Sequence, residues 1–328
     1  MPKTHQTPSN LSENADFIQN KAKFGEKAQF TGVNEHFEPN FNAVLAERCV
    51  FGQPPSIQSL LNKEKSSPIE PLDIEILLAH CLNKNRTFLH TWPETQLNPA
   101  QLKQFNDLMS QKKQGIPLAY ILGYREFWSL EFAVTQHVLI PRHETELLIE
   151  MTLELFEKAN DAISMVDLGT GSGVIAISIA HERPQFNITA TDVSIDALQI
   201  AKQNAQQLTS THINFIQSHW FDALKNQQFN LVISNPPYIE PEDVHLEQGD
   251  LRFEPAIALS PKDHGLSAIT HIIDHAKEHL YAGGYLILEH GYDQQKSIIN
   301  LLNQAGYSNI KAYQDLAKVD RAISAQWL

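Results

Sequence analysis

The sequence has few of the features that mark secreted or membrane proteins. Its 328 residues include two cysteines, Cys49 and Cys81, which are too few for a disulfide framework. It contains no run of about 18 apolar residues, the minimum for a membrane-spanning helix. No apolar segment of a signal peptide follows the first lysine. These absences favour a reduced, cytoplasmic protein that does not contact a membrane.

Positive charge is also scarce. Lys and Arg number 25 against 38 Asp and Glu, which gives a formal net charge of -13. Broad nucleic-acid binding depends on Lys and Arg that neutralise phosphates. The composition therefore predicts no direct nucleic-acid partner, and we expect a monomer whose partner is basic or neutral at the contact.

Composition and periodicity divide the chain into four parts. Residues 1–45 are rich in polar residues without a clear period, which predicts a disordered tail. Residues 46–122 have helical periodicity and predict a small helical domain. Residues 123–141 contain "REFWSLEFAV", whose alternation predicts a linking hairpin. Residues 142–328 form the remaining, larger domain.

Two segments carry the helical prediction. "PLDIEILLAHCL" places apolar side chains on one helix face: Ile74, Leu77, Leu78, Cys81 and Leu82. "NPAQLKQFNDLMSQKKQG" begins with a capping Asn98 before Pro99 and ends at Gly115.

From residue 163 onward, apolar strands alternate with helical segments. The predicted strands are "ISMVDL", "NITATD", "INFIQS", "FNLVIS" and "YLILEH". The predicted helices are "SGVIAISIAHE", "SIDALQIAKQNAQQL", "LSAITHIIDHAKEHL" and "DQQKSIINLLNQAG". This order predicts an α/β, doubly wound fold with a parallel sheet covered by helices on both faces.

A glycine-rich turn joins the first of these strands to its helix in "DLGTGSG". Its residues are Gly169, Thr170, Gly171, Ser172 and Gly173. Glycines let a ligand approach the backbone, and the helix that follows offers free N–H groups. Asp192 ends the next strand, where a carboxylate can accept both ribose hydroxyls. The pattern predicts a nucleoside-bearing ligand, with NAD and S-adenosylmethionine as candidates. Asp167 favours the second, because a carboxylate attracts a sulfonium and repels a pyrophosphate.

A stiff polar corner, "NPPY", follows the buried strand "FNLVIS". Two prolines, Pro236 and Pro237, fix their own φ angles, and Asn235 precedes them. The Asn235 side-chain oxygen and nearby carbonyls are acceptors that suit an –NH₂ group, and Tyr238 can cover the flat face of an amide. Such acceptors favour a pyramidal nitrogen and align it with a methyl donor. The corner therefore predicts amide or aromatic-amine methylation.

These motifs resemble the glutamine-specific methyltransferases that modify peptide-chain release factors. The likeness runs from about residue 55 to the C-terminus and includes these segments: "GYREFWSLEFAV", "VLIPRHETELLIE", "DLGTGSGVIAISIA", "TDVSIDAL", "SHWFDAL", "NPPYI", "RFEPAIAL" and "LILEHGYDQQ". "NPPY" alone is shared with adenine methyltransferases. The resemblance implies a seven-stranded Rossmann-like domain at 142–328 that transfers a methyl group from S-adenosyl-L-methionine to the glutamine of the release factor's Gly-Gly-Gln motif.

The resemblance also implies roles for single residues. The cofactor would be held by Gly169, Thr170, Gly171, Ser172, Gly173, Asp192, Trp220 and Asn235, with Trp220 near the adenine. The substrate glutamine would be held by Asn235, Pro236, Pro237 and Tyr238, of which Asn235, Pro236 and Tyr238 would be catalytic. The helical domain at 46–122 would dock the release factor.

Three segments depart from the family pattern. His143 stands where proline is usual, "LSPKDHGL" replaces a more glycine-rich stretch, and "DLAKVDR" lacks a usual glycine. All three lie outside the cofactor and amide motifs, so they bear on substrate docking rather than on catalysis.

Other features have an ordinary and a functional interpretation. In "IPRHETE", Arg142, Glu144 and Glu146 either begin a helix or shape the cofactor pocket. The histidines spaced by four residues, His271, His275 and His279, favour a solvated helix flank over a metal site. Three rival functions remain: methylation of adenine in DNA or RNA, methylation of a ribosomal-protein glutamine, and a noncatalytic binding module.

Overall fold

The structure is a computed structural model that describes residues 54–158, 163–209, 212–240, 242–243, 249–260 and 265–328. The predicted disordered tail at 1–45, Cys49 and residues 261–264 of "LSPKDHGL" lie outside these residues. Among the described residues, no helix is both long enough and apolar enough to cross a membrane.

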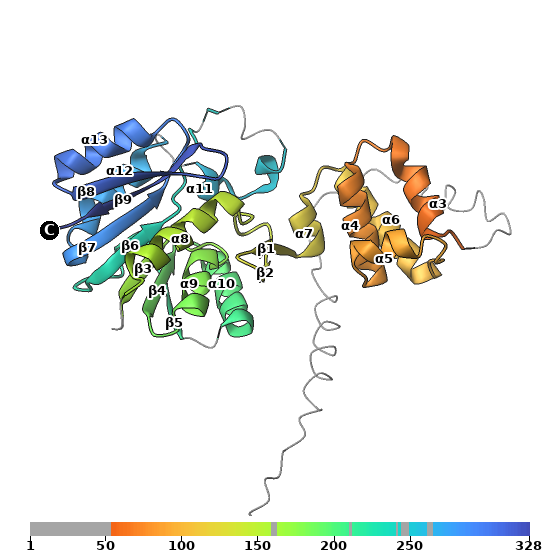
Figure 1. Cartoon of the computed structure of the whole chain (residues 1–328), viewed down its shortest axis with the longest axis horizontal. Helices are drawn as coiled ribbons and strands as arrows, with labels where there is room; N and C mark the ends of the chain where they lie inside the picture. The colour runs from red at the N-terminus through yellow and green to blue at the C-terminus, as the bar shows by residue number, and fades with distance from the viewer. Residues whose placement is uncertain (1–53, 159–162, 210–211, 241, 244–248, 261–264) are drawn as a thin grey trace, which may run out of the picture. The chain divides into compact units, whose positions relative to one another are not determined.

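The region from residue 54 to 122 is helical (Figure 1). Its elements are α3 (Ile57–Lys63), η1 (Glu64–Ser66), α4 (Pro71–Leu82), α5 (Arg86–Thr91), α6 (Pro99–Lys113) and α7 (Leu118–Leu122). The predicted apolar face of α4 is buried, with Ile74, Leu77, Leu78, Cys81 and Leu82 in one hydrophobic cluster. The predicted Asn98 cap is confirmed: its side chain accepts from the Gln101 N–H, and the Gln101 side chain accepts from the Asn98 N–H.

The predicted hairpin is confirmed as β1 (Tyr124–Phe127) paired antiparallel with β2 (Leu130–Ala133). Its turn residues, Trp128 and Ser129, have φ angles of 51° and 58° although neither is glycine. Glutamates hold the turn: the Trp128 N–H donates to Glu146 and the indole Nε1 donates to Glu182, both at 2.9 Å. These two bonds offset the strain of a left-handed backbone.

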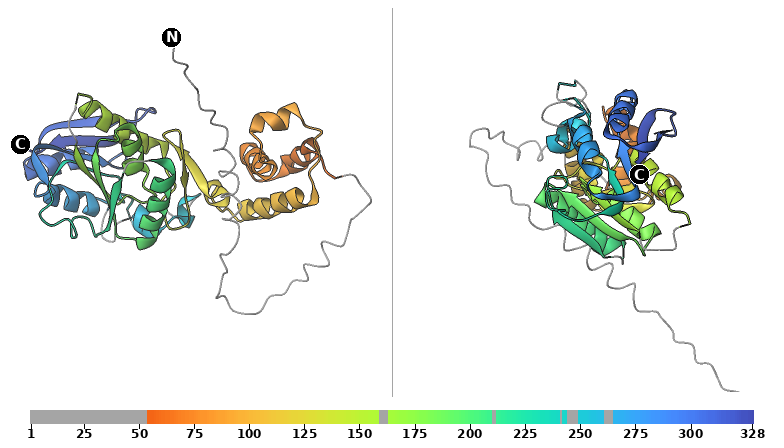
Figure 2. Two further views of the ribbon diagram at one scale, coloured as in Figure 1. Left: turned by 90° about the horizontal axis from the view of Figure 1, so that it is seen from below. Right: turned by 90° about the vertical axis from the view of Figure 1, so that its left-hand side faces the viewer.

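The larger domain is built on a seven-stranded sheet with strand order β5-β4-β3-β6-β7-β9-β8 (Figures 1 and 2). The strands are β3 (Ser164–Leu168), β4 (Asn187–Asp192), β5 (Ile213–Gln217), β6 (Phe229–Ser234), β7 (Leu280–Glu289), β8 (Ser308–Gln314) and β9 (Asp320–Gln326). The helices are η2 (His143–Thr145), α8 (Glu146–Leu155), α9 (Val174–Glu182), α10 (Ile195–Leu208), η4 (Leu251–Phe253), α11 (Ala256–Leu259), α12 (Ser267–Ala276) and α13 (Gln295–Ala305).

Helices cover both faces of this sheet, as the alternation of strands and helices predicts. Met165 of β3 packs in the cluster formed with α8 and α9, whereas the next residue, Val166, packs in the cluster formed with α12 and α13. Alternate residues of a strand point to opposite faces, so both faces of β3 are buried.

The expectation of a wholly parallel sheet is wrong. The pairs β3–β4, β3–β6, β4–β5 and β6–β7 are parallel, but β9 runs antiparallel to both β7 and β8. Strand β9 inserts between β7 and β8 because the chain after α13 returns as an antiparallel hairpin. The carboxyl ends of β3, β4, β6 and β7 still meet at one edge, where ligands bind in such sheets.

Candidate active site

The glycine turn follows β3 at this edge. Gly169, Gly171 and Gly173 all have left-handed backbones, with φ of 70°, 57° and 87°. A Cβ on Gly173 would lie 2.7 Å from Cδ1 of Ile177 and 3.2 Å from Cβ of Ala201. Gly173 is therefore required for the close packing of α9, whereas a Cβ on Gly171 would meet nothing within 4 Å.

Asp192, at the end of β4, is bound to the turn. Its Oδ2 accepts from the Gly171 N–H and its Oδ1 accepts from the Ser194 N–H, both at 2.9 Å. Burial raises the pKa of Asp192, and the bonds from backbone N–H groups oppose that rise. A carboxylate has about four acceptor positions, so these two bonds leave capacity for further donors.

Asn204 of α10 secures the turn from the other side, a role that no motif in the sequence predicts. The fully buried side chain donates from Nδ2 to the Ser172 carbonyl at 2.8 Å. The same amide pairs with the backbone of Ala133 in β2, accepting its N–H at 2.8 Å and donating to its carbonyl at 3.1 Å.

Asp167 lies beneath the turn. Its side chain is fully buried and its Oδ2 accepts from the Thr170 hydroxyl at 2.6 Å. Burial raises the pKa of Asp167 to about 7. The carboxyl has no surface on which to contact a ligand, so it supports the turn, and the sequence argument that used its charge to choose between two cofactors loses its basis.

Trp220 lies beside the glycine turn. A Cβ built on Gly169 would be 3.7 Å from Cζ3 of the indole, so the ring faces the place where the turn lacks a side chain. The backbone of Trp220 is left-handed, with φ of 49°, and its carbonyl accepts from the Ser218 hydroxyl at 2.9 Å. This bond fixes the loop that presents the ring.

The "NPPY" corner follows β6 and lines a cavity of about 70 Å³. The lining residues are Leu139, Arg142, Asn235, Pro236, Pro237, Tyr238, Ile239, Leu251, Ala258, Leu259 and Glu289. The structure thus brings together all four residues predicted to hold the substrate. Because β6 pairs with β3, with Ser234 opposite Leu168, the corner begins directly beside the glycine turn.

Two residues without a predicted role complete the corner. The Asn235 Nδ2 donates to the Thr145 hydroxyl oxygen at 3.1 Å, and that hydroxyl donates to Oε2 of Glu289 at 2.7 Å. The Tyr238 hydroxyl donates to Oε1 of Glu289 at 3.2 Å. Burial raises the pKa of Glu289 to about 7, although the hydrogen bonds from the hydroxyls of Thr145 and Tyr238 oppose that rise. Burial and the adjacent Glu289 also raise the pKa of Tyr238.

The "IPRHETE" segment contributes one residue to the cavity itself. Arg142 lines the cavity and pairs with the buried Glu254, which also accepts from the Ile140 N–H at 3.3 Å. The other two charged residues of this segment lie outside the cavity. Glu146 accepts from the Trp128 N–H in the hairpin turn, and Glu144 is exposed. His143, the departure from the family pattern, is exposed and 3.4 Å from Glu146.

The histidines do not share one helix face, because α12 ends at Ala276. His271 and His275 stack with ring centroids 4.2 Å apart, but His279 stacks on Phe221 at 4.6 Å. Within the described ranges, no group of three or more His, Cys, Asp or Glu residues is arranged to hold a metal.

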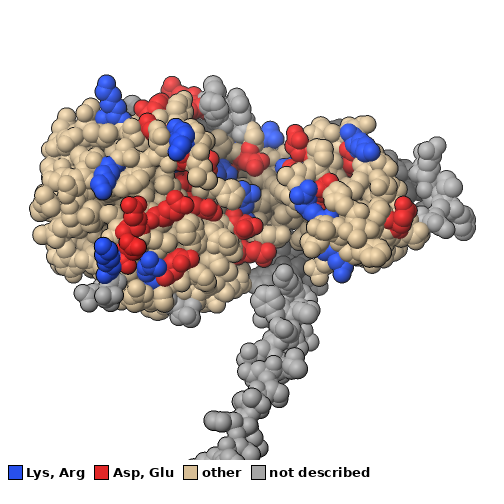
Figure 3. Space-filling model, viewed as in Figure 1, with Lys and Arg blue, Asp and Glu red and all other residues tan. Residues whose placement is uncertain are grey.

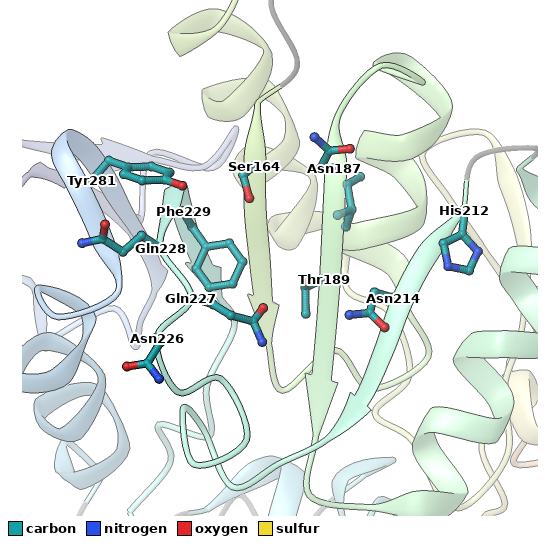
Figure 4. Close-up of a pocket in the computed structure, with 11 residues that line it drawn as sticks. Ser164, Asn187, Thr189, His212, Asn214, Asn226, Gln227, Gln228, Phe229 and Tyr281 are labelled. Atoms are coloured by element: carbon teal, nitrogen blue, oxygen red, sulfur yellow. The ribbon is translucent and has the colours of Figure 1, made fainter.

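A larger cavity, of about 410 Å³, lies at the opposite edge of the sheet (Figure 4). Its lining comes mostly from the amino ends of the strands and consists of Ser164, Asn187, Ile188, Thr189, His212, Asn214, Asn226, Gln227, Gln228, Phe229 and Tyr281. The glycine turn and the "NPPY" corner are at the carboxyl ends of the strands, so this cavity lies at the other end of the strands from both.

Comparisons with known proteins identify the family. A model described as the PrmC N-terminal domain matches residues 57–123, and one described as the methyltransferase small domain matches residues 144–257. The release factor glutamine methyltransferase of Shewanella oneidensis is 43% identical over 263 residues, covering 80% of this chain and 91% of the relative. The enzyme of the same description from Escherichia coli is 40% identical over 265 residues, covering 81% and 95%.

The chain belongs to the release factor glutamine methyltransferase family. The resemblance stated from the motifs is thereby confirmed. Among solved structures, the hMettl16 catalytic domain in complex with the MAT2A 3'UTR hairpin 1 superposes with a TM-score of 0.50 at 15% identity. The match covers 81% of this chain and 94% of that one. At this identity the likeness shows a shared fold alone.

Proposed function

We propose that this chain transfers a methyl group from S-adenosylmethionine to the side-chain amide nitrogen of the glutamine in the Gly-Gly-Gln motif of peptide-chain release factors. The observation that carries the proposal is the "NPPY" corner, which lines a small cavity and follows β6, the strand paired with the β3 strand that leads into the glycine turn. A site for an amide and a site for a nucleoside thus adjoin at one sheet edge.

The residues of the turn fit S-adenosylmethionine. The Trp220 ring lies beside Gly169 and provides an aromatic surface next to the turn for the adenine, and Asp192 retains acceptor capacity for ribose hydroxyls. The roles of Thr170, Gly171, Ser172 and Gly173 are to shape the backbone around the ligand. When bound, the cofactor supplies an electrophilic methyl group.

The corner performs the remaining steps. The Asn235 side-chain oxygen and the Pro236 carbonyl would accept the two N–H bonds of the substrate amide, which aligns its nitrogen and favours a pyramidal geometry. As the N–C bond forms, the bond between the methyl group and the sulfonium sulfur would break and S-adenosylhomocysteine would leave, so that the positive charge passes to the nitrogen beside these acceptors. The methylated amide then loses one proton to water. Pro237 and Tyr238 form the wall against which the flat amide packs.

A release factor as substrate also implies the cellular location of the enzyme. We propose a cytoplasmic monomer, because release factors work at the ribosome, and light scattering of the purified chain tests the oligomeric state. We propose no direct contact between this chain and nucleic acid. On the face drawn in Figure 3, Asp and Glu side chains form a band and the Lys and Arg side chains of the described residues are mostly scattered.

The test is methyl transfer to a purified release factor, its Gly-Gly-Gln variant with glutamine replaced by alanine, a ribosomal protein and DNA, side by side. Mass spectrometry should locate one added methyl group on the glutamine, and the alanine variant should gain none. Methyl on adenine or on the ribosomal protein, with the release factor unmodified, would support one of the rival functions instead.

A further inference from the structure

The "NPPY" corner depends on the direction of one hydrogen bond. An asparagine side chain is nearly symmetric in shape, but its two ends have opposite hydrogen-bonding character. Acceptance of a substrate –NH₂ requires that the Asn235 oxygen face the cavity and that its nitrogen face away. Nothing in the Asn235 side chain by itself selects this orientation over the flipped one.

Thr145 selects the orientation of the Asn235 amide only if the proton of its hydroxyl group points away from Asn235. A threonine hydroxyl has one proton and two acceptor positions. Because the proton is donated to Glu289 at 2.7 Å, the oxygen can only accept from its other neighbour, Asn235, at 3.1 Å. A Thr145 hydroxyl without this partner could instead donate to the asparagine oxygen.

We infer that Glu289 is a positioning residue that fixes which end of the Asn235 amide faces the substrate, and thereby sets the preference for glutamine over glutamate. The inference rests on the proposed function. A flipped Asn235 would present N–H donors, which suit the carboxylate of glutamate and repel the –NH₂ of glutamine. In its ionised form the carboxyl is suited to this task because it accepts at both oxygens, from Thr145 and from Tyr238.

The surroundings of Glu289 bury its carboxyl group, place charged residues near it and hold its orientation. The side chain is 1% exposed at the carboxyl end of β7. Arg321 of β9 favours its charged form, whereas Glu144 and burial favour the neutral form. Tyr238 donates to the oxygen that Thr145 leaves unused, so the carboxyl cannot turn away from Thr145 without breaking a second bond.

The experiment compares Glu289→Leu, Glu289→Gln, Thr145→Val and Thr145→Ser with the wild-type chain. Thr145→Ser retains the hydroxyl and should retain activity within about threefold. Thr145→Val and Glu289→Leu should lower kcat at least tenfold while the dissociation constant of S-adenosylmethionine stays within threefold. Glu289→Gln, which keeps one acceptor, should lie between. Thermal unfolding of each variant controls for misfolding.

Substrate discrimination is the readout that a merely structural role would not change. A release factor with glutamate in place of the motif glutamine serves as a competitive inhibitor. In the wild-type chain it should bind at least tenfold more weakly than the glutamine form, and in Glu289→Leu this ratio should fall towards one. An unchanged ratio in a folded Glu289→Leu, with methyl transfer by the wild type intact, would overturn the inference alone.

One measurement does not depend on the substrate. In the isolated chain labelled with ¹⁵N-asparagine, hydrogen exchange of the Asn235 –NH₂ group reports its bond to Thr145, and Asn235→Ala identifies the signal. Exchange should accelerate at least tenfold in both Thr145→Val and Glu289→Leu. If the wild-type chain methylates no release factor, the proposed function fails, and this exchange still decides the orientation of the amide. Equal exchange in all variants would refute it.

Discussion

Replacement of Asn235 by alanine separates a role in transition-state stabilisation from a role in folding. The substitution removes the side-chain oxygen proposed to accept from the reacting –NH₂ group. It also removes the 3.1 Å bond from Nδ2 to Thr145. The two losses have different sizes and appear in different measurements.

The loss of one preorganised transition-state hydrogen bond typically lowers kcat by about 10²–10³-fold, which is about 2.7–4 kcal/mol. The loss of the Thr145 bond should cost only about 0.5–1.5 kcal/mol of stability, because Thr145 keeps its stronger bond to Glu289. We therefore expect turnover to fall at least 100-fold while the midpoint of thermal unfolding shifts by a few degrees.

Asn230 of β6, the strand that leads into the corner, offers a matched control. It is half-buried like Asn235, and its Oδ1 accepts from the Ser164 N–H at 2.9 Å, at the opposite end of β6. Asn230→Ala should lose similar stability and keep its turnover. The assay is single-turnover methyl transfer to the release factor at saturating substrates. Equal turnover in the two alanine variants would show that Asn235 acts only through folding.

Three further predictions concern the turn. Asp192→Ala should weaken S-adenosylmethionine binding by about 1.5–3 kcal/mol, because a charged acceptor is lost; calorimetry that finds an unchanged dissociation constant would exclude a direct contact. Gly173→Ala should destabilise the fold by about 1–3 kcal/mol through its left-handed backbone and its close approach to Ile177 and Ala201, whereas Gly171→Ala should cost only the strain of its left-handed backbone while also weakening cofactor binding, and chemical unfolding compares the two losses of stability. The pKa of Asp167 is about 7 when folded against 3.8 for the free side chain, so the folded state holds a proton that the unfolded state releases. Stability should therefore fall as pH rises from about 4 to about 7, and Asp167→Asn should flatten this dependence.

The sheet shows where a pattern of hydrophobic residues is sufficient. β4 and β6 begin and end where the sequence predicts, because each combines small or apolar residues that the fold buries with a polar residue at its carboxyl end. The last two strands lack a clear apolar pattern. β8, "SNIKAYQ", is an edge strand with no fully buried residue, and β9, "DRAISAQ", begins with two charged residues. Their antiparallel pairing depends on contacts that no local pattern encodes.

The site shows a similar limit. Asn235, Gly169 and Asp192 were predictable because each stands at the end of an apolar strand. Thr145 and Glu289 were not assigned roles, although the hydrogen bond between them spans 144 residues of sequence. A usable signal existed at Glu289, since a carboxylate that ends a strand as apolar as "YLILE" requires a partner when buried. The identity of that partner follows only from the fold.

The three hydrogen bonds of Asn204 have a consequence for recombination between relatives. One side chain ties the β1–β2 hairpin at Ala133 to the glycine turn at Ser172, and it has no exposed surface. A chimera whose crossover falls between the hairpin and α10 inherits these partners from different parents. Because these partners are backbone groups, such a chimera retains the three bonds only if the parent that supplies residue 204 carries asparagine there and the backbones of the two parents match at the hairpin and the turn. The hairpin, the turn and residue 204 should therefore be exchanged as one block.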